Sequence, residues 1–235
     1  MRILTVIPAK GTSSRIPRKN LQDLGGKPLV HWTIDAALGV RGFDHYVVVS
    51  TDSAEIARVA TNAGAHILER PAELCRDPAE MSDVVLHALD TLEESVQPDT
   101  VCVLLPTSPF RTSQQVEEAL ALHGSERCNV VSVCDGRWLR DKLHQGAARI
   151  RSVVHDAWWV QRQAGAVAST TIAASTLCLL NGAIWIAAPG RIRTDTMVTP
   201  HGAAPYVMDA ESGLDIDTPL DLDLARCIAA RRSAA

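Results

Sequence analysis

The sequence contains 235 residues, of which 46% are hydrophobic, and its 23 basic and 27 acidic side chains give a net charge of −4. The hydrophobic content is sufficient for one large α/β domain. The slightly acidic balance argues against a general affinity for nucleic acids or anionic membranes. None of the six cysteines forms a Cys-x-x-Cys pair, so buried reduced thiols are expected instead of a disulfide framework or a zinc site.

Neither a targeting segment nor a membrane span is recognisable. The first residues form an apolar strand, without the charged and apolar regions of a signal peptide. No apolar run is long enough to cross a bilayer. We therefore expect a cytoplasmic protein without a membrane partner.

Up to about residue 134, short β-branched runs alternate with amphipathic stretches. The alternation predicts an α/β fold with a mostly parallel twisted sheet and helices on both faces. Pro28 fits the first position of a helix. The expected strands cover 3–7, 45–50, 65–68, 101–105 and 129–134, and the expected helices cover 28–40, 53–63, 81–95 and 113–123.

The pattern changes at about 135–180, which we interpret as a β-rich arm or flap inserted into a single domain that covers 1–235. Its tryptophans, Trp138, Trp158 and Trp159, can line a ligand, pack internally or form a subunit contact, and the sequence leaves these alternatives open. Residues 183–187 and 205–209 are expected to return to the sheet. Thr218, Pro219 and Asp221 then predict the capped start of a last helix.

The first strand runs directly into a loop of small, hydroxyl and basic residues. Small residues allow backbone N–H groups to approach an anion, and four cations, Lys10, Arg15, Arg18 and Lys19, can neutralise it. A polyphosphate site is therefore indicated; the alternative is a solvated basic turn. The spacing is neither that of a P-loop nor that of a dinucleotide-binding fold.

Two further segments carry candidate ligands. In an extended segment, the carboxylates of Asp215 and Asp217 leave the same face, roughly 6.5–7 Å apart at the backbone, which suits Mg²⁺. The alternative is that they only decorate the start of a helix. The turn at 105–111 offers ligand contacts from Thr107 and Ser108 and a cation, Arg111, for a carboxylate or phosphate; alternatively, Arg111 is a surface cation beside the capping residue Thr112. Because 8–20, 50–52 and 105–111 all follow strand ends, they are expected to meet in one crevice.

The order of these segments resembles the acylneuraminate cytidylyltransferase family, the CMP-sugar-acid synthetases and the related phosphonate cytidylyltransferases. Individual matches such as Pro-Thr-Ser-Pro-Phe-Arg-Thr at 106–112 are weak, but their number and order are specific. The matching segments are 7–9, 16–20, 24–29, 49–52, 83–89, 106–112, 130–133, 162–163, 181–184 and 215–219.

The resemblance implies a nucleotide-diphospho-sugar-transferase-like fold, a dimerisation arm and a homodimer. It also implies Mg²⁺-dependent transfer of CMP from CTP to an acidic acceptor, a sialic-type sugar acid, with release of pyrophosphate. Lys10, Arg15 and Lys19 would neutralise the triphosphate, with Asn20 near the base, and Asp215 and Asp217 would bind Mg²⁺. The other implied substrate-binding residues are Ala9, Gly11, Ser13, Ser82, Pro106, Thr107, Ser108 and Arg111 and, on the acceptor side, Arg162, Gln163 and Asn181.

Departures from the family pattern keep other functions open. Lys10 replaces the usual Arg, and Ser stands at the usual Lys of the first loop, where Arg15 can substitute. Leu105 replaces the usual Gln, and Trp185 the usual Tyr, which changes the acceptor side more than the nucleotide side. The alternatives are CMP transfer to a small phosphonate such as phosphonoformate, use of UTP or GTP, and nucleotide binding without catalysis.

Overall fold

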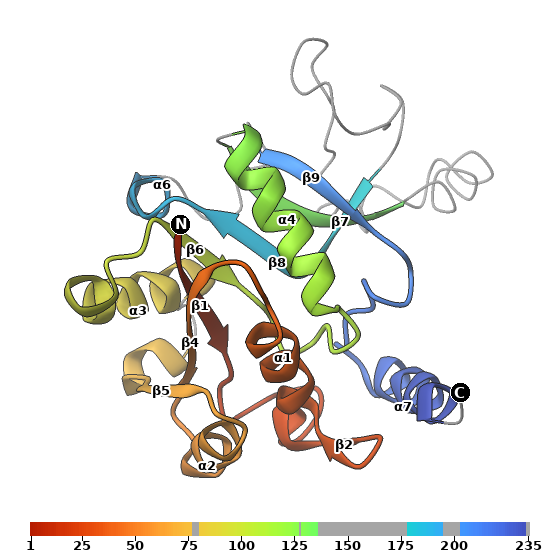
Figure 1. Cartoon of the computed structure of the whole chain (residues 1–235). Coiled ribbons are helices and arrows are strands. Elements are labelled where there is room, and N and C mark those ends of the chain that lie inside the picture. The colour runs from red at the N-terminus through yellow and green to blue at the C-terminus, as the bar shows by residue number, and fades with distance from the viewer. Residues whose placement is uncertain (77–79, 127, 136–177, 195–202, 234–235) are drawn as a thin grey trace, which may run out of the picture.

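The computed structural model describes residues 1–76, 80–126, 128–135, 178–194 and 203–233. These residues build a seven-stranded sheet in the order β5-β4-β1-β6-β8-β7-β9 (Figure 1). The strands are β1 (Arg2–Pro8), β4 (Asp44–Thr51), β5 (His66–Glu69), β6 (Thr100–Val103), β7 (Asn129–Asp135), β8 (Cys178–Ala187) and β9 (Ala203–Met208). A separate hairpin pairs β2 (Asp23–Leu24) with β3 (Lys27–Pro28).

The sheet is mostly parallel, as predicted. Neighbouring strands from β5 to β6 run in parallel, and so do β7 and β9. β8 is antiparallel to both β6 and β7. The register of β7 with β8 shifts between Val131 and Val133, so the pair contains an irregularity beside Asn181 and Gly182. β8 begins at Cys178, inside the expected arm; the rest of that arm, 136–177, lies outside the described residues.

The helices cover the sheet because its buried strands present apolar side chains to both faces. On β1, Ile3 and Ile7 pack into one apolar cluster, whereas Leu4 and Val6 pack into another. The helices are α1 (Leu29–Leu38), α2 (Ala54–Asn62), α3 (Met81–Val96), α4 (Ser113–Glu126), α6 (Pro189–Thr194) and α7 (Pro219–Ser233), with short 3-10 turns η1 (Lys19–Leu21) and η2 (Ala72–Cys75). None of the helices in this part of the chain is long and apolar enough to span a membrane.

The local capping signals are confirmed at two helices. Thr218 Oγ1 accepts a hydrogen bond from Asp221 N, and Asp221 Oδ2 accepts one from Thr218 N at the start of α7. Thr112 and Gln115 exchange the same pair of bonds at the start of α4. At α1 the prediction is one residue early: Pro28 lies in β3 with extended geometry, and Leu29 is the first helical residue.

A third apolar cluster lies away from the main sheet, where α7 contacts the β2–β3 hairpin (Figure 1). We call it the α7 cluster. It joins segments from both ends of the chain, and it therefore determines which loops can meet. Its buried members are Ile16, Leu24, Leu29, Phe110, Ile216, Leu222, Ala225 and Ala229.

Candidate active site

A cavity of about 360 Å³ lies at the carboxyl ends of the parallel strands. It receives side chains from 8–20, 70–76, 80–84 and 105–107, together with Asp217. The expected meeting of 8–20 with the turn after β6 is therefore found, as is usual for ligand sites of open α/β sheets. The third predicted segment, 50–52, does not line this cavity; its Asp52 lines an adjoining one. Its lining includes the predicted residues Lys10, Ser13, Arg15, Lys19, Asn20, Pro106, Thr107 and Asp217.

The basic loop that follows β1 is fixed from both sides. Gly11 N donates to Asp52 Oδ1 at 2.7 Å, and Asn20 Nδ2 donates to the main-chain oxygen of Lys10 at 2.9 Å. A side chain at Gly11 would come within 2.9 Å of Ser53 Cβ, so glycine permits this close approach to the loop after β4. Ile16 inserts into the α7 cluster and is only 3% exposed. The loop is thus held at both ends and at its middle.

Two cations of this loop converge on one carboxylate. Lys19 Nζ donates to the main-chain oxygen of Ile216 at 2.8 Å and lies 3.2 Å from Asp217 Oδ1. An Arg15 guanidinium nitrogen lies 3.1 Å from Asp217 Oδ2. Arg18, in contrast, pairs with Glu55 of α2. The prediction that Arg18 joins the other cations of the loop is therefore not met in this structure.

The acidic segment is oriented by the residue between its two carboxylates. Ile216 is fully buried in the α7 cluster, and its N–H donates to Thr107 O at 2.8 Å. Asp217 N donates to Asp221 Oδ2 at 3.1 Å, which ties the segment to the start of α7. Asp217 can therefore meet the basic loop, while Asp215 lies more deeply, against Thr107.

Asp215 carries the clearest sign of an incomplete site. Its Oδ1 atom is buried and has no hydrogen-bond partner. Burial raises the pKa of Asp215, and a hydrogen bond from Thr107 offsets only part of that shift. The nearby charge of Asp217 raises the pKa further, whereas Lys19 lowers it. A divalent cation would satisfy the free oxygen and favour the ionised form.

The donor set fits a magnesium ion that relies on its substrate for further ligands. Among the described residues no group of three or more His, Cys, Asp or Glu side chains is placed to hold a metal. Two carboxylates are nevertheless enough for Mg²⁺, which keeps several waters and takes phosphate oxygens as ligands. Asp215 and Asp217 are the residues that would hold it.

Comparisons with known proteins identify the family of the chain. A model of the family described as cytidylyltransferase matches residues 4–131. CMP-N,N'-diacetyllegionaminic acid synthase of Legionella pneumophila is 33% identical over 228 residues, which cover 94% of this chain and 93% of that protein. The chain belongs to the cytidylyltransferase family. It is thus a nucleotidyltransferase.

Two further comparisons extend the likeness of this cytidylyltransferase to known proteins. N-acylneuraminate cytidylyltransferase of Escherichia coli is 30% identical over 235 residues, and this chain spans about half of that protein, 53% of its length. The solved structure of CMP:2-keto-3-deoxy-manno-octonic acid synthetase complexed with CTP has a TM-score of 0.71 and 18% identity, covering 99% of this chain and 100% of that one. At this level of identity, the likeness to the solved structure shows the fold alone.

Sequence reasoning missed Arg70, a buried cation of the cytidylyltransferase site. Arg70 follows β5 and is 6% exposed; its Nε and one NH₂ group donate to the hydroxyl and main-chain oxygens of Ser50 at 3.2 and 2.8 Å. It lines both the site cavity and an adjoining cavity of about 710 Å³, as do Arg76 and Cys75. The signal in the sequence is a cation directly after a parallel strand, in Glu69-Arg70-Pro71.

Charge in the cavity favours an anionic ligand. Five cationic side chains line it, against the carboxylates of Glu80 and Asp217. A low-dielectric wall strengthens such a field, so the charge of the cavity suits an anion such as a polyphosphate. The five cations are Lys10, Arg15, Lys19, Arg70 and Arg76.

Arg111 requires a correction. It is neither a surface cation nor directed at the cavity, because it is only 3% exposed and its guanidinium donates to three protein oxygens: Ala183 O, Thr33 Oγ1 and Leu105 O. Burial lowers the pKa of Arg111 to about 9. Ser108 is likewise fully buried, and its hydroxyl has no partner. In this structure both residues shape the turn that carries Thr107.

Asn181 is also buried and forms hydrogen bonds within the protein interior. Its Oδ1 accepts hydrogen bonds from Ser132 Oγ at 2.5 Å and from Ala183 N at 3.2 Å, so it stabilises the irregular pairing of β7 with β8. Ala9 is buried and Ser82 pairs with Glu80; neither these two nor Gly11 line the cavity. The predicted acceptor residues Arg162 and Gln163 lie outside the described residues.

Proposed function

We propose that this cytidylyltransferase transfers CMP from CTP to a nonulosonic sugar acid and releases pyrophosphate. The observation that carries the proposal is the meeting of Lys19 with Asp217 at a cation-rich cavity. The names of the two relatives above, a CMP-legionaminic acid synthase and an N-acylneuraminate cytidylyltransferase, support this class of acceptor.

The basic loop suits the triphosphate of CTP. Lys10, Arg15 and Lys19 line the cavity and would neutralise most of its negative charge. Such pairing also lowers the repulsion between the nucleotide and an acidic acceptor. Positioning two anions that otherwise repel each other accounts for much of the expected rate enhancement.

The chemical step is an in-line displacement at the α-phosphorus. An oxygen of the acceptor forms a new P–O bond while the bond from the α-phosphorus to the bridging oxygen breaks. The electron pair of that bond leaves with pyrophosphate, and the proton of an attacking hydroxyl is released. Lys19 and Arg15 would stabilise the charge that accumulates on the phosphate oxygens.

Asp215 and Asp217 would hold Mg²⁺, which when bound polarises phosphate oxygens and stabilises the developing charge. In this structure Asp217 pairs with Arg15 and Lys19. The triphosphate would attract the same two cations, which would release the carboxylate. We therefore expect nucleotide and metal to bind cooperatively, with weak metal binding to the free protein.

The cavity also contains apolar side chains. Its apolar lining residues include Leu74, Met81, Val84, Leu105 and Pro106, and the family resemblance would place Leu105 on the acceptor side. An apolar wall at Leu105 offers no hydrogen bond to a sugar hydroxyl, so it favours acceptors with few hydroxyl groups nearby. Phosphonoformate therefore belongs in the test beside the sugar acids.

The deciding experiment is mass spectrometry after incubation of the protein with CTP, Mg²⁺ and each acceptor in turn. The panel comprises N-acetylneuraminic, legionaminic, pseudaminic and 3-deoxy-manno-octulosonic acids and phosphonoformate, with UTP and GTP as alternative donors. A CMP conjugate of a nonulosonic acid, formed with stoichiometric pyrophosphate, supports the proposal. A conjugate of phosphonoformate alone, or CTP binding without pyrophosphate release, contradicts it.

We further propose a cytoplasmic homodimer, as the family resemblance implies. Sedimentation equilibrium of the full chain tests the dimer directly. A mass of one chain over the working concentration range would contradict it.

A further inference from the structure

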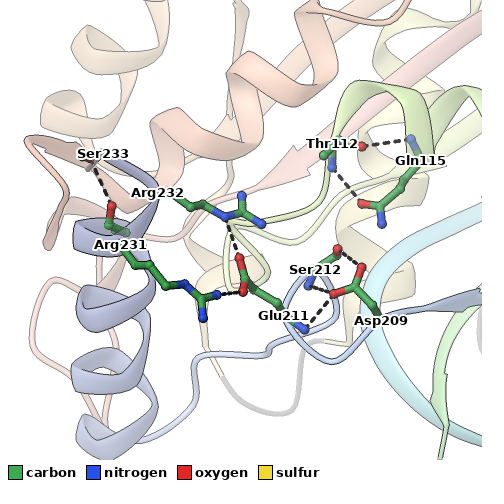
Figure 2. Close-up of polar contacts among 9 residues, drawn as sticks. Thr112, Gln115, Asp209, Glu211, Ser212, Arg231, Arg232 and Ser233 are labelled. Carbon is green, nitrogen blue, oxygen red and sulfur yellow. Dashed lines mark hydrogen bonds and ion pairs between the residues drawn. The ribbon is translucent and has the colours of Figure 1, made fainter. Parts of the chain in front are cut away.

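Glu211 receives two guanidinium groups from the last turn of α7 (Figure 2). Arg232 Nε donates to Glu211 Oε1 at 2.7 Å, and Arg231 donates to the other carboxylate oxygen. These contacts lower the pKa of Glu211, with the hydrogen bond from Arg232 the largest cause. Glu211 lies four residues before Asp215, in the segment that leads from β9 to the acidic pair.

Arg232 also makes a second contact, which Arg231 does not make with any described residue. Its guanidinium carbon lies 4.7 Å from the centre of the Phe110 ring, in a cation–π arrangement. Phe110 is 1% exposed and packs edge-to-face on Trp32, with 5.7 Å between ring centres. The Phe110 ring is therefore held in place and can support the Arg232 guanidinium. The Arg231 side chain, in contrast, is 70% exposed.

These two contacts join the two segments that build the proposed metal site. Glu211 belongs to the segment that carries Asp215 and Asp217, and Phe110 belongs to the turn that carries Thr107. Thr107 in turn bonds to the Asp215 side chain and accepts from Ile216 N. Arg232 thus connects the two segments whose contact at Thr107 orients Asp215 and Asp217.

The segment between Glu211 and Asp215 has little freedom to absorb a movement. Asp209 Oδ1 accepts from the N–H groups of both Glu211 and Ser212 at 2.9 Å, which closes a tight turn visible in Figure 2. Gly213 fits so closely that a Cβ there would lie 2.4 Å from Cys134 Sγ and 2.6 Å from Asn181 Nδ2. A displacement of Glu211 is therefore transmitted toward Asp215.

The far end of the acidic segment is attached to the same helix. Asp221, in the first turn of α7, accepts from Thr218 N at 2.7 Å and from Asp217 N at 3.1 Å. A helix of 15 residues is about 22 Å long and rigid. α7 consequently holds the acidic segment at both ends, by its first turn and by its last.

We propose that Arg232 is a positioning residue that sets Asp215 and Asp217 for metal binding by bridging Glu211 and Phe110. The inference rests on the proposed function, since it takes the two carboxylates as the metal ligands. It concerns the acidic segment; the basic loop has two further contacts of its own, from Gly11 to Asp52 and from Asn20 to Lys10, so CTP binding should change less than metal binding.

The test compares Arg232→Ala with Arg231→Ala, a matched control from the same helix that shares Glu211 but has no ring contact with the described residues. Mn²⁺ affinity is measured by electron paramagnetic resonance in the presence of saturating CTP, and CTP affinity by calorimetry in EDTA. Arg232→Ala should weaken Mn²⁺ binding five- to tenfold and leave CTP binding within twofold. Arg231→Ala should change neither by more than twofold.

Arg232→Lys provides a second variant in case truncation impairs folding. Lysine keeps the charge near Glu211 but lacks the planar group that lies over Phe110. We expect intermediate Mn²⁺ affinity, a higher KM for the metal and, at saturating metal, an unchanged KM for CTP. Equal Mn²⁺ affinity in the wild type and both Arg232 variants would overturn the inference, even if their melting temperatures fall. Failure of the wild type to bind CTP would instead refute the proposed function.

Discussion

Lys19 lies 3.2 Å from the carboxylate of Asp217, although 198 positions separate the two residues in the sequence. Two apolar anchors bring them together: Ile16 and Ile216 are buried in the same α7 cluster. Burial of one such side chain contributes about 1.5–3 kcal/mol, whereas a partly exposed ion pair contributes about 0–1 kcal/mol. The apolar anchors therefore hold the site together, and the ion pair itself is free to exchange partners.

Asp217→Asn should abolish turnover without unfolding the protein. The amide is a poor metal ligand, and loss of the metal's charge stabilisation is expected to lower kcat about 1,000-fold or more. Pyrophosphate release measures the loss. Asp223→Asn is the control, because Asp223 lies on α7, is 68% exposed and pairs with Arg226. Full activity of Asp217→Asn would remove the metal assignment.

Lys19→Met tests the role of the basic loop. Lys19 is the least exposed partner of Asp217, with 15% of its side chain accessible, so its charge acts in a poorly hydrated place. We expect kcat/KM for CTP to fall about 100-fold, the size typical for removal of one preorganised donor to a transition state. Steady-state kinetics with CTP as the varied substrate provides the measurement.

Arg18→Met is the neighbouring control for Lys19→Met. This substitution removes a positive charge one residue away from Lys19. The Arg18 side chain, however, contacts Glu55 and does not line the cavity. Its kcat/KM should stay within twofold of the wild type. Equal losses in the two variants would mean that the loop acts by its total charge and not through Lys19.

Local signals predicted much of this fold, because strands and helix caps depend on residues that lie close together in the sequence. β1 is a run of apolar β-branched residues, and the Thr218–Asp221 cap needs only four positions. The orientation of β8 was not predictable in this way, because a mostly apolar strand has the same pattern in both directions. Its antiparallel pairing depends on contacts with β6 and β7 alone.

The buried arginines show why part of the site escaped prediction. Arg111 bonds to Ala183, 72 positions away, and Arg70 bonds to Ser50, 20 positions away. In the sequence, each of these arginines is a cation that follows a strand. A cation that binds a ligand has the same sequence pattern. Long-range hydrogen bonds decide between the two roles, and sequence spacing alone does not reveal them.

Asp215→Asn should stabilise the protein in the absence of metal while removing activity. The wild-type carboxylate is buried with one free oxygen, and burial disfavours its charge. Removal of that charge is expected to raise the melting temperature in EDTA by about 2–4 °C, which corresponds to about 1 kcal/mol for a chain of this size. Differential scanning fluorimetry at pH 7 measures the shift.

Asp217→Asn should not raise the melting temperature in the same assay. Its carboxylate is already paired with Arg15 and Lys19, so neutralising it leaves two cations close together without a counter-charge. We expect an unchanged or lower melting temperature in EDTA. If Asp215→Asn also melts below the wild type, the buried carboxylate is not a source of instability in the metal-free state.

The stability of the protein should fall as the pH drops from 6.5 to about 4, because of His45. This residue lies on β4 beside Thr5, and burial lowers its pKa from 6.5 to about 4. In this range the unfolded chain binds a proton that the folded protein rejects, so acid favours unfolding. A loss of about 2 kcal/mol is expected, after allowance for the partial exposure of the ring.

Urea unfolding of the wild type and His45→Gln between pH 5 and 7 measures this loss. The variant has no group at position 45 that titrates in this range, so its free energy of unfolding should vary less with pH. His66→Gln, which replaces an exposed histidine on the edge strand β5, is the control and should keep the wild-type slope. Identical slopes in all three proteins would mean that His45 is protonated within the folded structure, and its burial would then not determine the acid stability.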